Sequence, residues 1–180
     1  MVRQELEEVE PIVRNADMIS VDISAVRHSD APGNGNASPN GFYGEEICRI
    51  MRYAGMSDKL SSIGVYEINP ELDPSGNTCH LAAQMIWYFI DGYYHRMNDF
   101  PVFNENQFLK YTVTIKDRKD ELVFYKSKKS DRWWMDVPVS TSLQDIYERH
   151  RYVPCSYKDY RTACKDDIPD RWWQAHQKMM

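Results

Sequence analysis

Two carboxylates in this sequence each stand near the end of an apolar run typical of a buried β-strand. Asp22 lies in the run 18–24, and Glu67 lies in the run 62–68. Turn-forming residues follow each run, including the Gly, Pro and Asn residues of segment 27–41. Open α/β sheets hold metal and substrate ligands in loops at the carboxyl ends of their strands. Asp22 and Glu67 are therefore the first candidates for site residues.

The elements around these carboxylates predict how they are positioned. Run 18–24 shows almost no polar alternation before Asp22, which is typical of a central parallel strand covered on both faces. Run 62–68 is predicted to be a second apolar strand. Segment 27–41 is predicted to be a long loop, and segment 43–54 a helix that ends at a C-cap glycine, Gly55. A strand, helix and strand in this order form a right-handed crossover with parallel strands. Asp22 and Glu67 should then emerge at the same edge of the sheet.

The remaining elements predict two regions, 1–97 and 98–180. In the first, residues 2–15 should form a helix that Pro11 interrupts. The helix over 78–96 is apolar around much of its circumference and should be largely buried.

In the second region, residues 108–135 should form a separate antiparallel sheet. Its hairpin is expected from strands 111–115 and 122–125 around the turn 117–120, with Trp133-Trp134 as a third short strand. Helices are expected over 141–150 and around Trp172-Trp173.

Composition narrows the classes of partner. The 180 residues carry a net charge of −5 and a pI near 5.5, which argues against nucleic acid as a partner. The short basic stretch 126–129 is flanked by acids and is interpreted as a solvated turn. No membrane span or leader segment is recognised, so no membrane partner is expected. The four cysteines lack C-x-x-C spacing, so we expect no disulfide framework or zinc site and a location in the reducing cytoplasm.

The segment from Ser20 to Gly35 resembles a family signature without a gap. It reads SVDISAVRHSDAPGNG. The arginase/agmatinase/formimidoylglutamase (ureohydrolase) family has S-x-D-x-D-x-x-D-P followed by A-P-G-x-G. Asp22 matches the first aspartate, which in that family bridges two metal ions, commonly manganese. The second and third aspartates are replaced by Ser24 and Arg27, and the proline by His28, so the resemblance implies degenerate ligand positions at Ser24 and Arg27.

A second block, Gly64 to Asp73, strengthens the resemblance. It reads GVYEINPELD and is followed by Thr78 and by Leu81-Ala82-Ala83. The family has V-E-V-N-P-x-x-D and then T-A-x-L-A-A. The resemblance places Glu67 at the carboxylate that pairs with the guanidinium or formimino nitrogen of the substrate, both a catalytic and a substrate-binding position. The alternative interpretations are that Glu67 is an acid paired to a neighbouring helix and that Asp22 is an acid that caps a neighbouring loop.

The resemblance covers roughly residues 15–96 and implies the carboxyl-terminal portion of a three-layer α/β/α sheet, with an appended antiparallel and helical tail. The G-G-D-H and D-A-H-x-D ligand segments of the family do not occur in residues 1–180. We therefore expect part of a longer protein or a truncated gene product, with Mn²⁺ belonging to the family rather than to this chain alone.

Two functions stay open. The first is part of a metal-dependent hydrolase of linear C–N bonds, acting on a small molecule such as an arginine-like compound or N-formimidoylglutamate. The second is a non-catalytic scaffold or assembly protein that has lost the second metal. A homo-oligomer is compatible with either function.

Overall fold

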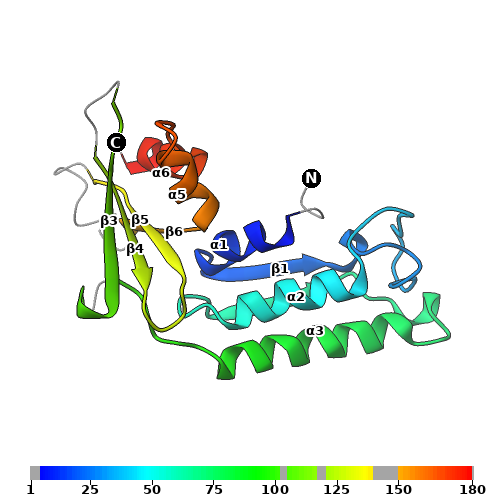
Figure 1. Cartoon of the computed structure of the whole chain (residues 1–180). Helices are drawn as coiled ribbons and strands as arrows, with labels where there is room; N and C mark the ends of the chain where they lie inside the picture. Colours follow the sequence, from blue (N-terminus) through cyan, green and yellow to red (C-terminus); the bar gives the residue numbers. More distant parts are fainter. Residues whose placement is uncertain (1–4, 102–104, 117–120, 140–149, 180) are drawn as a thin grey trace. The chain divides into compact units, whose positions relative to one another are not determined.

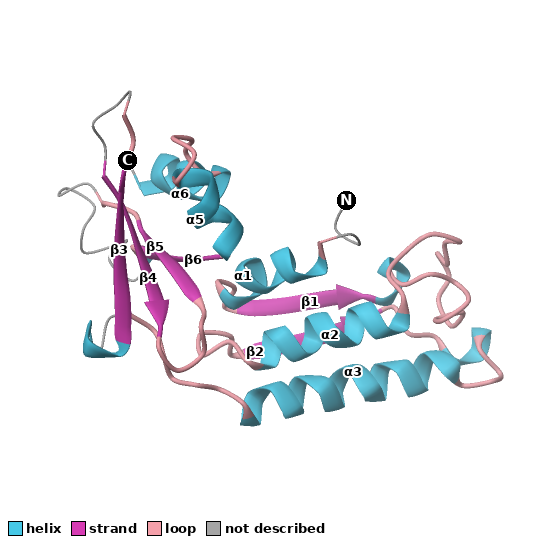
Figure 2. Cartoon of the chain, in the orientation of Figure 1, coloured by secondary structure: helices cyan, strands magenta, loops and turns pink. Residues whose placement is uncertain are grey.

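The computed structural model describes residues 5–101, 105–116, 121–139 and 150–179. The chain divides into two compact units, Met1–Arg96 and Met97–Met180. Each unit has its own sheet and its own hydrophobic core, and the helices and strands are labelled in Figure 1 and coloured by type in Figure 2. No helix in the described part of the chain is long and apolar enough to span a membrane.

The first unit is built on a parallel pair of strands. β1 (Met18–Asp22) pairs with β2 (Ser62–Tyr66) in a register that aligns Met18 with Ser62 and Asp22 with Tyr66. The connection contains α2 (Gly44–Gly55), which runs alongside β1 in Figure 1. The predicted parallel and adjacent strands are confirmed. Both strands therefore end at the same edge of the sheet.

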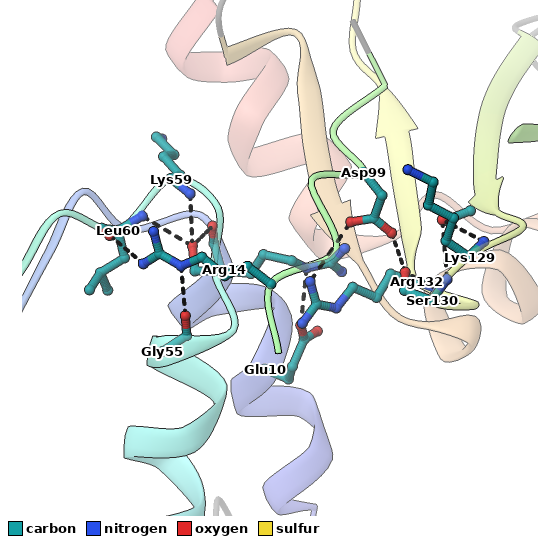
Figure 3. A network of polar contacts seen from close by, with 12 residues as sticks. Glu10, Arg14, Gly55, Lys59, Leu60, Asp99, Lys129, Ser130 and Arg132 are labelled. Atoms are coloured by element: carbon teal, nitrogen blue, oxygen red, sulfur yellow. Dashed lines mark hydrogen bonds and ion pairs between the residues drawn. The ribbon is translucent and has the colours of Figure 1, made fainter. Parts of the chain in front are cut away.

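Two further helices of this unit lie within its described residues. α1 (Val9–Arg14) follows a 3₁₀ turn at Leu6–Glu8, and α3 (Asn77–Tyr94) follows the second strand. Pro11 does not break α1, because it lies in the first turn, where a backbone N–H has no partner within the helix. Glu10 and Arg14 form an ion pair one turn apart on α1, at 3.1 Å (Figure 3).

α2 presents one apolar face to the core of this unit. Ile47, Met51 and Ala54 recur at the spacing of one helical stripe, and each is at most 3% exposed. Covering a side chain such as Ile47 or Met51 stabilises the fold by roughly 1.5–3 kcal/mol. The helix begins where the Glu46 carboxylate accepts a 2.8 Å hydrogen bond from the Tyr43 amide. The stripe and this cap together explain why the sequence forms a helix here.

The strand pair is covered on one face within the described residues. Val21 is buried and its register partner Val65 packs against the same core, whereas Met18 and Tyr66 are 61% and 54% exposed. Alternate residues of a strand point to opposite faces, so the opposite face of the pair is open. The prediction that strand 18–24 is covered on both faces is therefore wrong for this chain. The strand also ends earlier than predicted, because residues Ile23–Ala25 form a 3₁₀ turn.

α3 is less buried than predicted. One side of the helix packs against the core through residues such as Leu81 and Met85. The other side carries exposed large apolar residues, with Trp87 61% exposed, and the further members are Ile86, Ile90, Tyr93 and Tyr94. The prediction was wrong because the apolar content of a helix shows how much of its surface can be buried. It does not show whether other elements of the chain cover that surface.

Gly55 has a different role from the predicted C-cap. It is the last residue of α2, and Met56 follows in the C-cap position. A Cβ atom at Gly55 would lie 2.1 Å from the Phe89 carbonyl oxygen, and a Cβ at Gly92 would lie 2.3 Å from the Arg52 carbonyl oxygen. The two glycines therefore allow the backbones of α2 and α3 to approach closely.

In the residues that the structure describes, the second unit contains an antiparallel sheet followed by two helices. Its strand order is β3 (Phe108–Thr114), β4 (Glu121–Ser127), β5 (Trp133–Asp136) and β6 (Tyr152–Cys155), and α5 (Tyr157–Ala163) and α6 (Asp170–Met179) follow. The predicted hairpin, the third strand at Trp133-Trp134 and the terminal helix are confirmed. β6 and α5 were not predicted. The predicted helix over 141–150 lies almost wholly outside the described residues, as does the turn 117–120.

A buried carboxylate anchors the turn between β4 and β5. Asp99 is 1% exposed, accepts a hydrogen bond from the Ser130 hydroxyl and lies 3.9 Å from the Arg132 guanidinium (Figure 3). The Ser127 hydroxyl accepts from the amide of Lys129 at 3.1 Å in the same turn. Lys126 and Ser127 end β4, and Lys128 and Lys129 lie in the turn that these contacts hold.

Candidate functional site at the strand ends

The two predicted site carboxylates lie at one edge of the parallel strand pair. Asp22 is the last residue of β1, and its register partner on β2 is Tyr66. Glu67 is the next residue after Tyr66, so the two acids follow neighbouring strands at the same end. Both side chains are exposed. The structure thus brings together at one sheet edge two residues that are 45 positions apart in sequence.

Asp22 shapes the turn that follows its strand. Its Oδ1 atom accepts a 2.8 Å hydrogen bond from the Ser24 amide. Hydrogen bonds from the Ser24 side chain and then from its amide lower the pKa of the Asp22 carboxyl below its ordinary value. The side chain is therefore ionised at neutral pH. Asp22 caps a local turn while it keeps a charged carboxylate oxygen at the sheet edge.

Arg27, which the resemblance predicts to stand at a degenerate ligand position, is engaged in local contacts. Its Nε lies 2.8 Å from Oδ1 of Asp30, and its guanidinium carbon lies 3.9 Å from the centre of the Tyr43 ring. The other oxygen of Asp30 accepts a 2.9 Å bond from the Gly44 amide at the start of α2. Burial raises the pKa of Asp30, but the hydrogen bonds from Gly44 and then from Arg27 outweigh it and leave that pKa lowered. These contacts hold a cation at the position that the resemblance predicts for an acidic ligand.

Glu67 has an unusual backbone conformation. Its φ angle is +64°, in the left-handed region that non-glycine residues avoid. The conformation costs an L-residue with a Cβ atom roughly 1–2 kcal/mol, and such residues cluster at functional sites. Sequence reasoning identified Glu67 by its place at a strand end, but nothing in the residue type signalled the positive φ.

Two residues important for the geometry of this edge were missed from the sequence. Asp73 and Thr78 are 4% and 0% exposed, and their hydrogen bonds connect the loop after β1 to the loop after β2. The available signal was their presence in the block that resembles the family, with Asp73 ahead of the first turn of a helix.

The strand-end residues of this chain do not fit a complete metal site by themselves. In the described residues, no group of three or more His, Cys, Asp or Glu side chains is arranged to hold a metal ion. Asp22 supplies one suitable oxygen donor, while Ser24 is neutral and Arg27 is positively charged. Manganese sites favour several carboxylate and imidazole ligands. A metal held at Asp22 would therefore need ligands from elsewhere.

Comparisons with known proteins match the first unit. Formimidoylglutamase from Staphylococcus haemolyticus is 30% identical over 86 residues, which are 47% of this chain and 28% of that protein. Formimidoylglutamase from Bacillus subtilis is 28% identical over 90 residues, 48% of this chain and 28% of that protein. This chain thus spans just over a quarter of the length of these curated relatives.

Alignments with solved structures cover about half of this chain, as the alignments with the curated relatives do. Trypanosoma cruzi formiminoglutamase with Mn²⁺ aligns with a TM-score of 0.49 and 21% identity, over 53% of this chain and 34% of that chain. The Bacillus subtilis formimidoylglutamase structure aligns with a TM-score of 0.49 and 27% identity, over 54% and 33% of the two chains.

The family assignment rests on the sequence. The profile described as "Arginase family" matches residues 1–91, which are half of the chain and include both strand ends. The fold class agrees with the prediction, since a parallel α/β unit is followed by a separate antiparallel sheet. The chain belongs to the arginase family.

Proposed function

We propose that residues 1–91 supply two strand ends of an arginase-type hydrolase site that cleaves a linear C–N bond in a guanidino or formimino compound. The observation that carries the proposal is Glu67. Its carboxylate follows a strand whose parallel neighbour ends at Asp22, and its backbone is held at φ +64°. A strained residue persists where the surrounding structure fixes it, and such residues are concentrated at functional sites.

Each carboxylate has a separate role in this proposal. Glu67 accepts hydrogen bonds from the positively charged nitrogen of the substrate, because charge-assisted contacts of this kind are stronger than neutral ones. Asp22 would supply one oxygen ligand to a manganese ion, whose other ligands would have to come from outside this chain's strand ends. The metal supplies an activated water when it is bound. The curated relatives are formimidoylglutamases, which favours a formimino substrate, and a cytoplasmic location is part of the same proposal.

A second candidate is a non-catalytic member of the family that serves as a scaffold. The observation that favours it is Arg27, whose guanidinium is paired with Asp30 and stacked on Tyr43 where the family has an acidic ligand. A positive charge beside a cation site weakens metal binding. The two candidates therefore differ in whether a metal can bind next to Arg27 and Ser24.

A chimera separates the two candidates. Residues 1–91 of this chain replace the matching segment of Bacillus subtilis formimidoylglutamase, which supplies the rest of an arginase-type domain. Formamide release from N-formimidoylglutamate and urea release from arginine are then measured with Mn²⁺ present. The matched control carries Ser24→Asp and Arg27→Asp, which restore the acidic residues of the family signature.

The expected result is measurable turnover by the unmodified chimera. Asp22→Ala should abolish that turnover together with metal content, whereas Glu67→Gln should lower kcat/KM while the metal stays bound. A soluble, folded chimera that is inactive until the two aspartates are restored would contradict the catalytic proposal and support the scaffold.

A further inference from the structure

Two loops that follow neighbouring strands meet at Gly33. The Gly33 carbonyl accepts a 2.8 Å hydrogen bond from the Asn69 amide, two residues after Glu67. The Gly33 amide donates a 2.8 Å bond to Oγ1 of Thr78, at the start of α3. Gly33 thus links the loop after Asp22 to both sides of the turn that follows Glu67.

The contact needs a glycine and a small polar partner. A Cβ atom at Gly33 would lie 2.9 Å from Thr78 Oγ1 and 3.1 Å from the Asn69 carbonyl oxygen. Thr78 is completely buried. A buried amide that loses its acceptor is destabilising because it has no water to replace the bond. The Thr78 hydroxyl is therefore the acceptor on which this loop contact depends.

Asp73 holds Thr78 in place. Its Oδ2 accepts a 2.6 Å bond from the Thr78 amide, and its Oδ1 accepts a 2.5 Å bond from the Ser75 hydroxyl. The bond from the Thr78 backbone to Asp73 fixes the start of α3, where the Thr78 hydroxyl oxygen accepts from the Gly33 amide. The chain of bonds runs from Asp73 through Thr78 and Gly33 to Asn69.

We propose that Thr78 and Asp73 are positioning residues, which fix the loop after β1 against the loop after β2 and thereby hold Glu67 at its positive φ. The argument is that the strain at Glu67 must be opposed by nearby contacts, and the buried bonds through Gly33 restrain the chain two residues downstream. The catalytic meaning of this positioning rests on the proposed role of Glu67.

The test uses the full chain, labelled for NMR, and a nearly isosteric pair of variants. Thr78→Val removes the hydroxyl but keeps the branched shape, and Thr78→Ser keeps the hydroxyl. Two local signals are measured: hydrogen-exchange protection of the Gly33 and Asn69 amides, and the strong amide-to-Hα NOE within Glu67 that a positive φ produces.

Thr78→Val should lower protection of the Gly33 amide by about tenfold or more, the size expected for one lost buried hydrogen bond, and should weaken the Glu67 NOE. Thr78→Ser should retain both signals. Asp73→Ala serves if Thr78→Val does not fold, and should show the same pattern. A folded Thr78→Val or Asp73→Ala chain with an unchanged Glu67 NOE and unchanged Asn69 protection would overturn the proposal.

These readouts do not depend on turnover. A chimera that is inactive even though Thr78→Val shifts the Glu67 signals would contradict the proposed function and leave the positioning role supported. An active chimera in which Thr78→Val leaves the Glu67 NOE and kcat/KM unchanged would contradict the positioning role alone.

Discussion

Glu67 carries a side chain that its own backbone conformation disfavours. Because glycine adopts φ of +64° without strain, Glu67→Gly should raise the free energy of unfolding of the first unit by about 0.5–1 kcal/mol. Urea unfolding followed by circular dichroism measures the change. The same substitution removes the carboxylate, so the proposed substrate contact should be lost while stability increases.

Asp166 is the matched control for that change. Its φ is +63° in the second unit, but aspartate tolerates this conformation better than glutamate does. Asp166→Gly should therefore stabilise its unit by less than Glu67→Gly stabilises the first unit. A destabilised Glu67→Gly chain would show that the side chain makes a structural contribution that outweighs its strain.

Asp73 makes the first unit sensitive to acid. The hydrogen bond from Ser75 and then that from the Thr78 amide lower the pKa of Asp73 from 3.8 to about 2. A carboxyl with a lowered pKa in the folded state contributes stability above its unfolded pKa, and that stability is lost as pH falls through the folded pKa. The contribution of Asp73 should thus be complete above about pH 4 and decline toward pH 2.

Asp73→Asn tests this pH dependence. The variant should be less stable than the parent chain at pH 6, and the difference should shrink between pH 4 and pH 2 because protonation removes the charge of Asp73 in the parent. Asp22 and Asp30 also have lowered pKa values, so part of the acid sensitivity remains in the variant. The midpoints of urea unfolding are measured for both chains across this pH range. A difference between the two midpoints that stays constant with pH would contradict the predicted role of Asp73.

At the scale of elements, the packing of α2 on α3 depends on two glycines. A Cβ at Gly92 would lie 2.3 Å from the Arg52 carbonyl oxygen and 3.0 Å from the Met56 amide nitrogen. These are backbone atoms and cannot move aside as a side chain can. Gly92→Ala should therefore destabilise the first unit by about 2 kcal/mol or more, despite the better helix propensity of alanine.

Gly35→Ala provides the control for Gly92→Ala. Gly35 lies in the loop after β1, and nothing lies within 4 Å of a Cβ built there. Its substitution should change the free energy of unfolding by no more than about 0.5 kcal/mol. If both substitutions change the free energy of unfolding by the same amount, α2 and α3 can move apart without loss of stability. Their close approach would then contribute nothing to the stability of the first unit.

The elements that the sequence predicted well are those with strong local signals. The strands and α2 have clear apolar runs with turn residues on either side. β6 was not predicted, and Pro154 is an unfavourable residue for a strand interior, yet β6 lies at the edge of the described sheet, where proline is tolerated. The start of α5 had an unused signal, since Ser156 and Asp159 form a capping box.

At the scale of the whole molecule, sequence patterns located the candidate site better than they predicted its surroundings. The parallel crossover was enough to place Asp22 and Glu67 at one edge. The uncovered face of the strand pair and the exposed side of α3 could not be predicted, because burial depends on which neighbours are present. The hydrogen bonds through Gly33 join residues 36 or more positions apart and leave no local pattern.

The chain of residues 1–180 should not bind Mn²⁺ tightly by itself. Asp22 contributes one carboxylate, and the neighbouring signature positions hold neutral Ser24 and positively charged Arg27. Tight binding requires several protein ligands for each ion. Isothermal titration with Mn²⁺ should show weak uptake that changes little in Asp22→Ala, and Ser24→Asp with Arg27→Asp should increase it by restoring two negative charges. Stoichiometric uptake by the parent chain that Asp22→Ala abolishes would contradict this prediction, because it would show that the residues of this chain complete a metal site without help.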